Sequence, residues 1–193
     1  MKDIINDLKF TVFDFETTGY SPYKGAEIIE VGAVKIRDGE IEAPFQEFVK
    51  PSRSLPAKII ELTGITPDDL ETARSVDEVM DDFSSYLIET VLVAHNASFD
   101  LSFLNYYSPR KIENPHIDSL RLARKLGDFE SNSLDNLVLE LDLNRSNAHR
   151  ALDDARATAA LFLQLAEEID SPRDCRECEI PAFIEEKIRE KKV

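Results

Sequence analysis

The stretch Phe10–Gly19, FTVFDFETTG, constrains this chain more than any other part of it. It begins as an apolar run typical of a buried strand and ends in a Thr-Thr-Gly turn signal. Because side chains alternate across a strand, Asp14 and Glu16 share one face, and Phe13 and Phe15 share the other. Neighbouring carboxylates in an apolar strand repel each other. A divalent cation such as Mg²⁺ or Mn²⁺ relieves this cost, and so does solvent at an exposed strand end. The stretch therefore predicts either a metal site or a solvated pair of acids.

Length and composition predict one soluble domain with a substantial core, since the chain has 193 residues, of which 42% are hydrophobic and 32% charged. No apolar run approaches the roughly 20 residues that span a bilayer. The N-terminus lacks the layout of a secretory signal, so we expect a cytoplasmic protein with no membrane partner. The net charge of −15 disfavours a broad basic surface for nucleic acid. It does not exclude an enzyme that binds a strand end through metal ions.

Cys175 and Cys178 form a single C-x-x-C motif, and the chain has no second pair to complete a structural zinc site. We expect two reduced thiols in a tail segment. A zinc site shared between two copies and a redox pair are the alternatives.

The pattern of the remaining chain predicts an α/β fold with a mixed sheet covered by helices. Further strands are expected at 27–37, 40–50, 91–94 and 114–118, and Asp38-Gly39 is typical of a hairpin turn between the first two. Helices are expected at 56–62, from 66 onward, and at 75–87, 99–106, 120–126, 133–140, 149–169 and 181–192. Residues 171–179 are expected to be irregular.

A third acid follows the apolar strand expected at 91–94. In open α/β sheets, ligands bind outside the carboxyl ends of strands. Asp100 can therefore meet Asp14 and Glu16 at one edge of the sheet. The alternative is that Asp100 is an ordinary acid in the first turn of a helix.

The helix expected at 149–169 offers two neighbouring acids, Asp153 and Asp154. At about 100° per residue, Asp154 lies at the edge of the apolar face and Asp153 lies on the solvent side. His149 precedes Asp154 by five residues, which separates the two by about 140° on a helix. Both serve one site only if His149 lies in the preceding loop or a frayed first turn. A mobile histidine there suits proton transfer, and a surface histidine is the alternative.

Three segments, FDFETTG, HNASFD and HRALDDA, resemble in this order the motifs of the DnaQ-like (DEDDh) 3′–5′ exonucleases. They are most similar to the proofreading exonucleases of bacterial DNA polymerase III, namely the epsilon subunit and the PolC exonuclease domain. The segment Leu62–Thr66 resembles the H-G-I-T stretch of that branch, with Thr63 where histidine is usual. On this basis we divide the chain into an N-terminal extension (1–9), an exonuclease domain (10–170) and a C-terminal tail with a short amphipathic helix (171–193).

The resemblance implies an RNase H-like fold with five strands, three of them an antiparallel start and the rest parallel. It implies hydrolysis of single-stranded DNA from the 3′ end to nucleoside 5′-monophosphates, as proofreading beside a replicative polymerase. Two divalent cations, Mg²⁺ or Mn²⁺, would be held by Asp14, Glu16, Asp100 and Asp154, with His149 as general base. An RNA-trimming exonuclease and a binding subunit with a vestigial metal site are the alternatives. The length fits a free-standing protein or part of a longer polymerase chain, and the sequence leaves the oligomeric state open.

The resemblance also implies substrate contacts. The residues expected to hold the terminal nucleotide are Thr17, Thr18, Gly19, Leu62, Ile65, Asn96 and Phe99. Core packing is the alternative for Leu62, Ile65 and Phe99. Basic residues available for upstream phosphates are Lys58, Arg74, Arg110, Lys111, Arg121, Arg145 and Arg150. Asp118 is expected to be a structural residue near the site.

Overall fold

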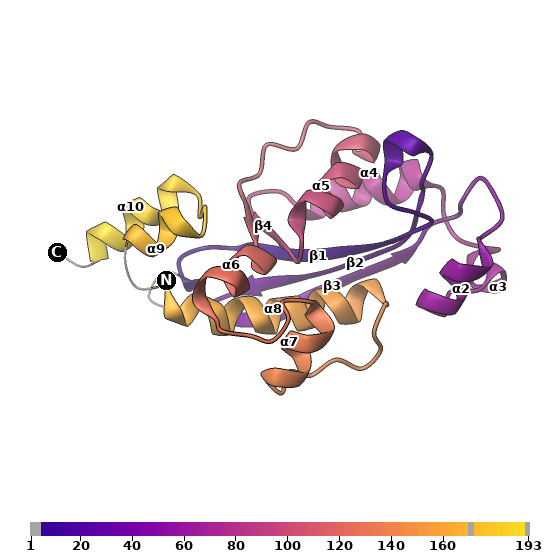
Figure 1. The fold of residues 1–193 in the computed structure, drawn as a ribbon. Coiled ribbons are helices and arrows are strands. Elements are labelled where there is room, and N and C mark those ends of the chain that lie inside the picture. The colour runs from indigo at the N-terminus through magenta and orange to yellow at the C-terminus, as the bar shows by residue number, and fades with distance from the viewer. Residues whose placement is uncertain (1–4, 170–171, 192–193) are drawn as a thin grey trace.

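One mixed sheet of five strands forms the centre of the molecule, in the order β3-β2-β1-β4-β5 (Figure 1). The computed structural model describes residues 5–169 and 172–191. Its strands are β1 (Phe10–Thr17), β2 (Ile28–Arg37), β3 (Glu40–Phe48), β4 (Val91–Ala94) and β5 (His116–Asp118). β2 runs antiparallel to β1 and β3, whereas β4 runs parallel to β1 and β5. The predicted α/β sheet, with its antiparallel start and parallel continuation, is confirmed.

Local sequence signals set the boundaries of these elements. Asp38 and Gly39 both have positive φ, 50° and 76°, as a two-residue hairpin turn requires. Thr66 and Ser75 each form a reciprocal capping box at the start of a helix. The helical elements are η1 (Pro22–Lys24), α2 (Ala57–Thr63), α3 (Pro67–Leu70), α4 (Val76–Tyr86), α5 (Ala97–Tyr107), α6 (Ser119–Leu126), α7 (Leu134–Glu140), α8 (Ala151–Glu168), α9 (Pro172–Glu177) and α10 (Ala182–Lys191).

The expectation that 171–179 is irregular was wrong, because α9 forms within it. Its sequence is too polar to show a helical period. Cys175 and Cys178 nevertheless lie one turn apart and are both buried, so tertiary packing stabilises this helix. Neither cysteine is in a disulfide. Burial raises the pKa of Cys175 to about 11, which keeps its thiol protonated, as expected for a reduced structural residue.

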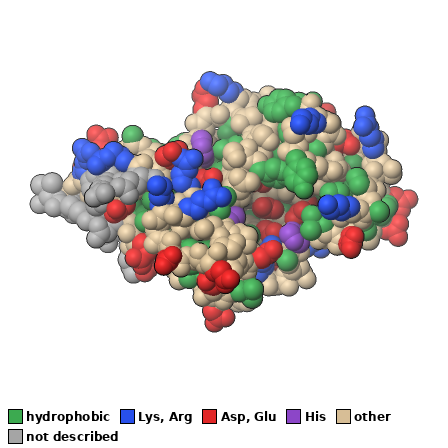
Figure 2. Space-filling view, in the orientation of Figure 1, with side chains coloured by type: hydrophobic (Ala, Val, Ile, Leu, Met, Phe, Trp, Pro, Cys, Tyr) green, Lys and Arg blue, Asp and Glu red, His purple; other side chains and the backbone are tan. Residues whose placement is uncertain are grey.

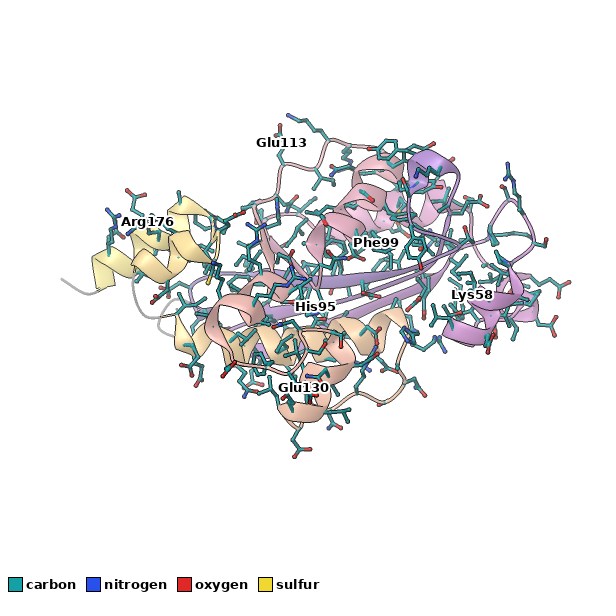
Figure 3. The ribbon with its side chains drawn as sticks, in the orientation of Figure 1. Lys58, His95, Phe99, Glu113, Glu130 and Arg176 are labelled. Atoms are coloured by element: carbon teal, nitrogen blue, oxygen red, sulfur yellow. The ribbon has the colours of Figure 1, made fainter. Side chains whose placement is uncertain are left out.

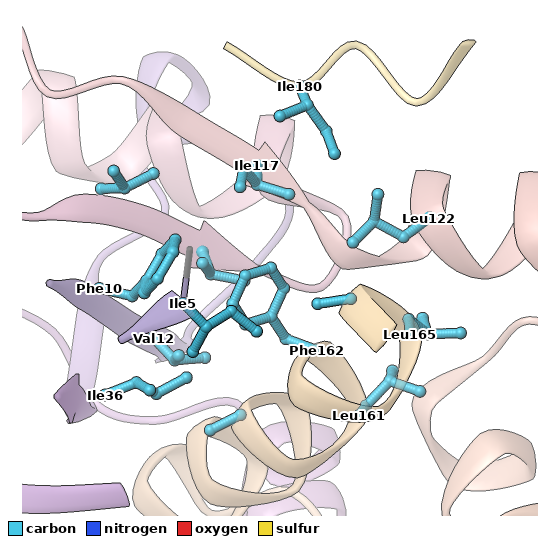
Figure 4. Packing of buried hydrophobic residues seen from close by; sticks show 14 of the residues in the cluster. Ile5, Phe10, Val12, Ile36, Ile117, Leu122, Leu161, Phe162, Leu165 and Ile180 are labelled. Atoms are coloured by element: carbon cyan, nitrogen blue, oxygen red, sulfur yellow. The ribbon is translucent and has the colours of Figure 1, made fainter. Parts of the chain in front are cut away.

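The alternation of β1 divides the interior into two cores. Phe10 and Val12 face α8, and the ring of Phe10 lies 5.0 Å from that of Phe162 (Figure 4). Phe13 and Phe15 face the other way and contact Phe83 of α4, with ring centroids 5.9 and 5.7 Å apart. The sheet is therefore covered by α8 on one face and by α4 and α5 on the other (Figure 1).

The C-terminal helices close one end of the first core. Ile184 and Ile188 of α10 are buried in the same cluster as Phe10 and Phe162. The apolar side of this amphipathic helix thus packs on its own domain.

The division of the chain at residues 9 and 170 stays a prediction. Among the residues that the structure describes, every helix is too short or too polar to cross a bilayer.

Gly32 of β2 lets α8 lie directly on the sheet. A Cβ atom added at Gly32 would stand 2.1 Å from the carbonyl carbon of Ala151 and from the amide nitrogen of Leu152. Both are backbone atoms, so no side-chain rotation relieves the clash. The first turn of α8 therefore sits at a fixed height above β2.

We expect Gly32→Ala to lower the free energy of unfolding by about 3 kcal/mol, because the methyl group displaces α8. Gly25→Ala is the matched control, since its added methyl group meets no heavy atom within 4 Å and only the positive φ of 84° opposes it. The control should cost about 1 kcal/mol. Urea unfolding measures the free energy of unfolding of both variants. Equal losses of stability would contradict the close approach of α8 to β2.

Candidate active site

β1 presents two acids to the face of the sheet that α8 covers. Asp14 pairs with Gly32 across the β1–β2 ladder, and Glu16 pairs with Glu30. Opposite residues of antiparallel strands share a face, so Asp14 and Glu16 lie at the place where the first turn of α8 rests on the sheet. Asp14 is half-buried and Glu16 is only 8% exposed. The alternative of a solvated strand end does not apply to Glu16.

Asp100 reaches the same place from α5. It lies in the first turn of that helix and is 2% exposed. Its Oδ1 accepts a hydrogen bond from the amide of Phe15, between Asp14 and Glu16, at 3.2 Å. Burial and then the charge of Asp14 raise the pKa of Asp100. The structure therefore brings Asp100 next to the acids of β1.

Asp154 and His149 complete the cluster from α8 and the turn before it. Ligand atoms of Glu16, His149 and Asp154 all lie within 4.8 Å of one another. His149 precedes the first residue of α8 and has a φ of 58°, so it lies in the loop, as the spacing required. Asp153 points elsewhere, since its Oδ2 accepts a hydrogen bond from the Asn147 amide at 2.9 Å. The structure therefore brings Asp154, and not Asp153, to the cluster.

The acids strongly disfavour one another's charged forms. Burial, followed by the charge of Asp154, raises the pKa of Asp14 to about 8. Burial, followed by the charge of Asp14, raises the pKa of Glu16 to about 9. Figure 2 shows acidic side chains inside a hollow, with a histidine and hydrophobic side chains at its rim. This hollow concentrates negative charge in poorly solvated surroundings.

One arginine offsets part of this charge. Arg145 donates from Nε to Oδ1 of Asp154 at 2.7 Å, and its Nη1 pairs with Asp135 of α7. The Arg145 side chain is 6% exposed. Burial raises the pKa of Asp154, and the guanidinium of Arg145 opposes that rise. Arg145 is therefore part of the site, which the sequence did not indicate, and it is not free to bind an upstream phosphate.

The residues present fit divalent cations. Four carboxylates and one imidazole face the hollow, and hard oxygen donors are those that Mg²⁺ and Mn²⁺ prefer. Arg145 pairs with Asp154, whereas the raised pKa values of Asp14 and Glu16 show that their charged forms need a further source of positive charge, which divalent cations would supply. Asp14, Glu16, Asp100 and Asp154 are the side chains placed to hold such ions.

The Thr-Thr-Gly turn after Glu16 is held by its own hydroxyl groups. The Thr17 hydroxyl donates to the carbonyl of Gly19 at 2.8 Å. The Thr18 hydroxyl accepts from the Glu27 amide at 2.8 Å. A Cβ at Gly19 would lie 3.3 Å from that of Ala26, so the turn packs closely on the following loop. The turn thus has a fixed shape beside the acids.

Apolar residues of the predicted substrate set divide into exposed and buried ones. Leu62 is 48% exposed, whereas Ile65 is 1% exposed and packs with Ile29 and Leu70. The burial of Ile65 favours core packing over a direct contact with substrate. Phe99 is partly buried beside Phe103, with ring centroids 5.1 Å apart, and lies on the α8 side of α5 in Figure 3.

The end of β4 is fixed by polar contacts. Asn96 is exposed, with a φ of 67°, and its amide donates to Oδ1 of Asp118 at 3.1 Å. Asp118 also caps α6 by accepting from the Leu120 amide, so its predicted structural role is confirmed. His95 bridges Ser119 and the Asn132 carbonyl, and burial lowers its pKa. The neighbours of His95 identify it as a structural residue.

Comparison with known proteins places this geometry in a family. The family model described as "Exonuclease" (RNase_T) matches residues 11–162. The chain belongs to the exonuclease family. Members of this family are nucleases, and the DnaQ-like resemblance of the three motifs is confirmed. The chain is 46% identical over 165 residues to a DNA polymerase III PolC-type of Thermotoga maritima, covering 83% of this chain and 12% of that protein.

Solved exonuclease structures share the fold. Exonuclease X in complex with 5′ overhanging duplex DNA superimposes with a TM-score of 0.68 at 27% identity, over 84% of this chain and 92% of that one. The nuclease domain of 3′hExo, a DEDDh family member bound to rAMP, gives a TM-score of 0.69 at 24% identity, over 83% and 92%. The RNase H-like arrangement expected of this exonuclease is therefore confirmed at the level of fold.

The raised pKa values predict that the metal-free exonuclease loses stability as pH rises. Glu16 and Asp14 hold protons more tightly folded than unfolded, so their stabilising contribution is complete below about pH 4 and is lost as pH rises through about 8 to 9. In EDTA, the melting temperature of the parent should fall relative to Glu16→Gln between pH 5 and 9. Added Mn²⁺ should reverse the fall at pH 8. A difference in melting temperature between the parent and Glu16→Gln that does not change with pH would contradict the raised pKa values.

Replacing Arg145 by Gln should destabilise the metal-free protein by about 3 kcal/mol, because it leaves Asp154 without its buried partner. The same change should tighten Mn²⁺ binding in calorimetry, since the guanidinium no longer competes for that carboxylate. Asp135→Asn is the matched control, as it frees only the outer end of Arg145. Weaker Mn²⁺ binding by Arg145→Gln would show that the arginine supports the ions instead.

Proposed function

We propose that this exonuclease hydrolyses single-stranded DNA from its 3′ end and releases nucleoside 5′-monophosphates. The observation that carries the proposal is the convergence of four carboxylates and His149 in one hollow. A binding subunit with a decayed metal site has no need of such a costly cluster, so the complete set favours catalysis.

Metal dependence follows from the donor set. Two divalent cations would lie among Asp14, Glu16, Asp100 and Asp154. When bound, such ions activate water and stabilise charge on the scissile phosphate. Glu16 and Asp100 are largely buried, so the protein holds their carboxylates in place before any ion arrives.

His149 acts as the general base. Its ring lies beside Glu16 and Asp154, and an imidazole nitrogen accepts a proton from the attacking water. The neighbouring carboxylates stabilise the imidazolium that forms. Its place in a turn, rather than within α8, lets the ring move as substrate enters.

The terminal nucleotide is held by the rim of the hollow. The Thr17–Gly19 turn offers its backbone and both threonine hydroxyl groups to the terminal nucleotide. The Thr17 hydroxyl donates to Gly19 and can still accept, and the Thr18 hydroxyl accepts from Glu27 and can still donate. The exposed side chain of Leu62 and the edge of Phe99 pack on the base. Asn96 shapes the 3′-end pocket from the end of β4, and Ile65 supports this region from within its core cluster with Ile29 and Leu70.

Proofreading beside a replicative DNA polymerase is the proposed setting. Its support is the similarity to PolC-type polymerases, of which this chain spans 12% of the length. Polymerase partner and DNA preference both rest on that similarity. An RNA-trimming activity is the alternative outcome of the assay below.

We expect Mn²⁺-dependent, single-nucleotide ladders from 5′-labelled single-stranded DNA. Asp14→Asn should abolish them, because a central carboxylate is lost. His149→Ala should slow hydrolysis by about 10² to 10⁴-fold, the usual contribution of a general base. Gel electrophoresis of timed samples, with RNA of the same sequence in parallel, measures both.

Asp77→Asn, on the exposed side of α4, is the control for carboxylate loss and should retain parental activity. Ladders confined to RNA would overturn the choice of DNA. Equal residual degradation by the parent and Asp14→Asn would point to a contaminant and remove the nuclease assignment.

A further inference from the structure

Glu30 is a buried acid that the proposed chemistry does not use. It lies on β2, is 0% exposed, and pairs across the ladder with Glu16. Both its oxygens are engaged. Oε1 accepts from the Gln46 side chain at 2.7 Å and from Nη2 of Arg150 at 3.0 Å. Oε2 accepts from Nε of Arg150 and from the amide of Ala151, each at 3.1 Å.

These contacts join β2 to the first residues of α8. The bidentate pair with Arg150 fixes the plane of the guanidinium, which also lies 5.3 Å from the ring of Phe48. The Ala151 amide is one of the N–H groups that a helix start leaves unpaired, and no side chain of the cap residue satisfies it. Glu30 therefore acts as the cap of α8 from another strand.

The anchored residues directly follow His149 in the chain. His149 has a φ of 58°, a conformation that costs a non-glycine residue roughly 1 kcal/mol. Such a backbone persists only where the surroundings hold it. Gly32 fixes the height of Ala151 above the sheet, and Glu30 fixes its amide and the side chain of Arg150.

We propose that Glu30 is a positioning residue for His149, acting through Arg150 and Ala151 to aim the imidazole at Glu16 and Asp154. This inference rests on the proposed role of His149 as general base. Stability alone does not explain the pair, because a buried ion pair is often no more stabilising than an apolar contact of the same shape. Positioning the side chain of His149 gives the Glu30–Arg150 pair a function.

The first test compares Glu30→Gln with the parent on single-stranded DNA. The neutral amide keeps the shape of Glu30 but loses the charge-assisted bidentate contact. We expect kcat to fall about 10- to 100-fold, because misplacing a catalytic group by about 1 Å has effects of this size. KM and Mn²⁺ affinity by calorimetry should stay within about twofold. Arg150→Lys keeps the charge without the planar fork and should give an intermediate loss.

A double-mutant cycle separates positioning from a general structural effect. Glu30→Gln in the His149→Ala background should cause no further loss, because the group it positions is gone. An additive loss would overturn the proposal. Glu42→Gln breaks the exposed Arg37–Glu42 pair at 3.1 Å and is the matched control, with unchanged kcat.

A third measurement, NMR of the histidine side chains, does not depend on catalytic activity. The chain has three histidines, so ¹H–¹⁵N spectra of the imidazoles are assignable with His149→Ala. The His149 signals should shift in Glu30→Gln and not in Glu42→Gln. Unmoved His149 signals would overturn the positioning role. An inactive parent with shifted signals would instead remove the proposed hydrolysis and leave the positioning intact.

Discussion

Electrostatic repulsion among four enclosed carboxylates is the constraint on which the rest of this structure depends. Asp14, Glu16, Asp100 and Asp154 share one poorly solvated hollow, and the pKa values of Asp14 and Glu16 rise to about 8 and 9 as a result. Such a cluster opposes folding in the absence of cations. It persists because two hydrophobic cores, one on each face of β1, hold the strand from both sides. The packing provides the stability, and the acids remain available for chemistry.

Three elements must meet for this cluster to exist, and small features set their approach. β1 supplies its acids through simple alternation, and α5 supplies Asp100 through a first turn bonded to the Phe15 amide. α8 supplies Asp154 only because Gly32 lets its backbone rest on β2. A side chain at Gly32 would move Asp154 and His149 together. The position of the site therefore depends on the absence of a Cβ atom at Gly32 as well as on the acids.

Much of the site was predictable because it follows from local periodicity. Alternation placed Asp14 and Glu16 on one face, and helical geometry selected Asp154 and required His149 to lie outside the helix. Long-range partners carry no such local signal. Arg145 lies in a polar loop, and nothing in that loop indicates that its side chain reaches Asp154. Glu30 looked like an ordinary strand residue, because its partner Arg150 is 120 residues away in the chain. α9 was missed for the same reason, since its helical form depends on burying Cys175 and Cys178 against distant residues.

The loop before α8 is held at both ends by ion pairs, in which Asp154 and Glu30 are buried and Asp135 is exposed. Arg145 joins it to Asp154 and Asp135, and Arg150 joins it to Glu30. His149 lies between these two anchors in a backbone conformation that it would not adopt on its own. A catalytic base needs a defined position in the closed site and freedom to let substrate in. Arg145 and Arg150 hold the short span that carries His149 from both sides, which gives the imidazole the defined position that its proposed role as general base needs.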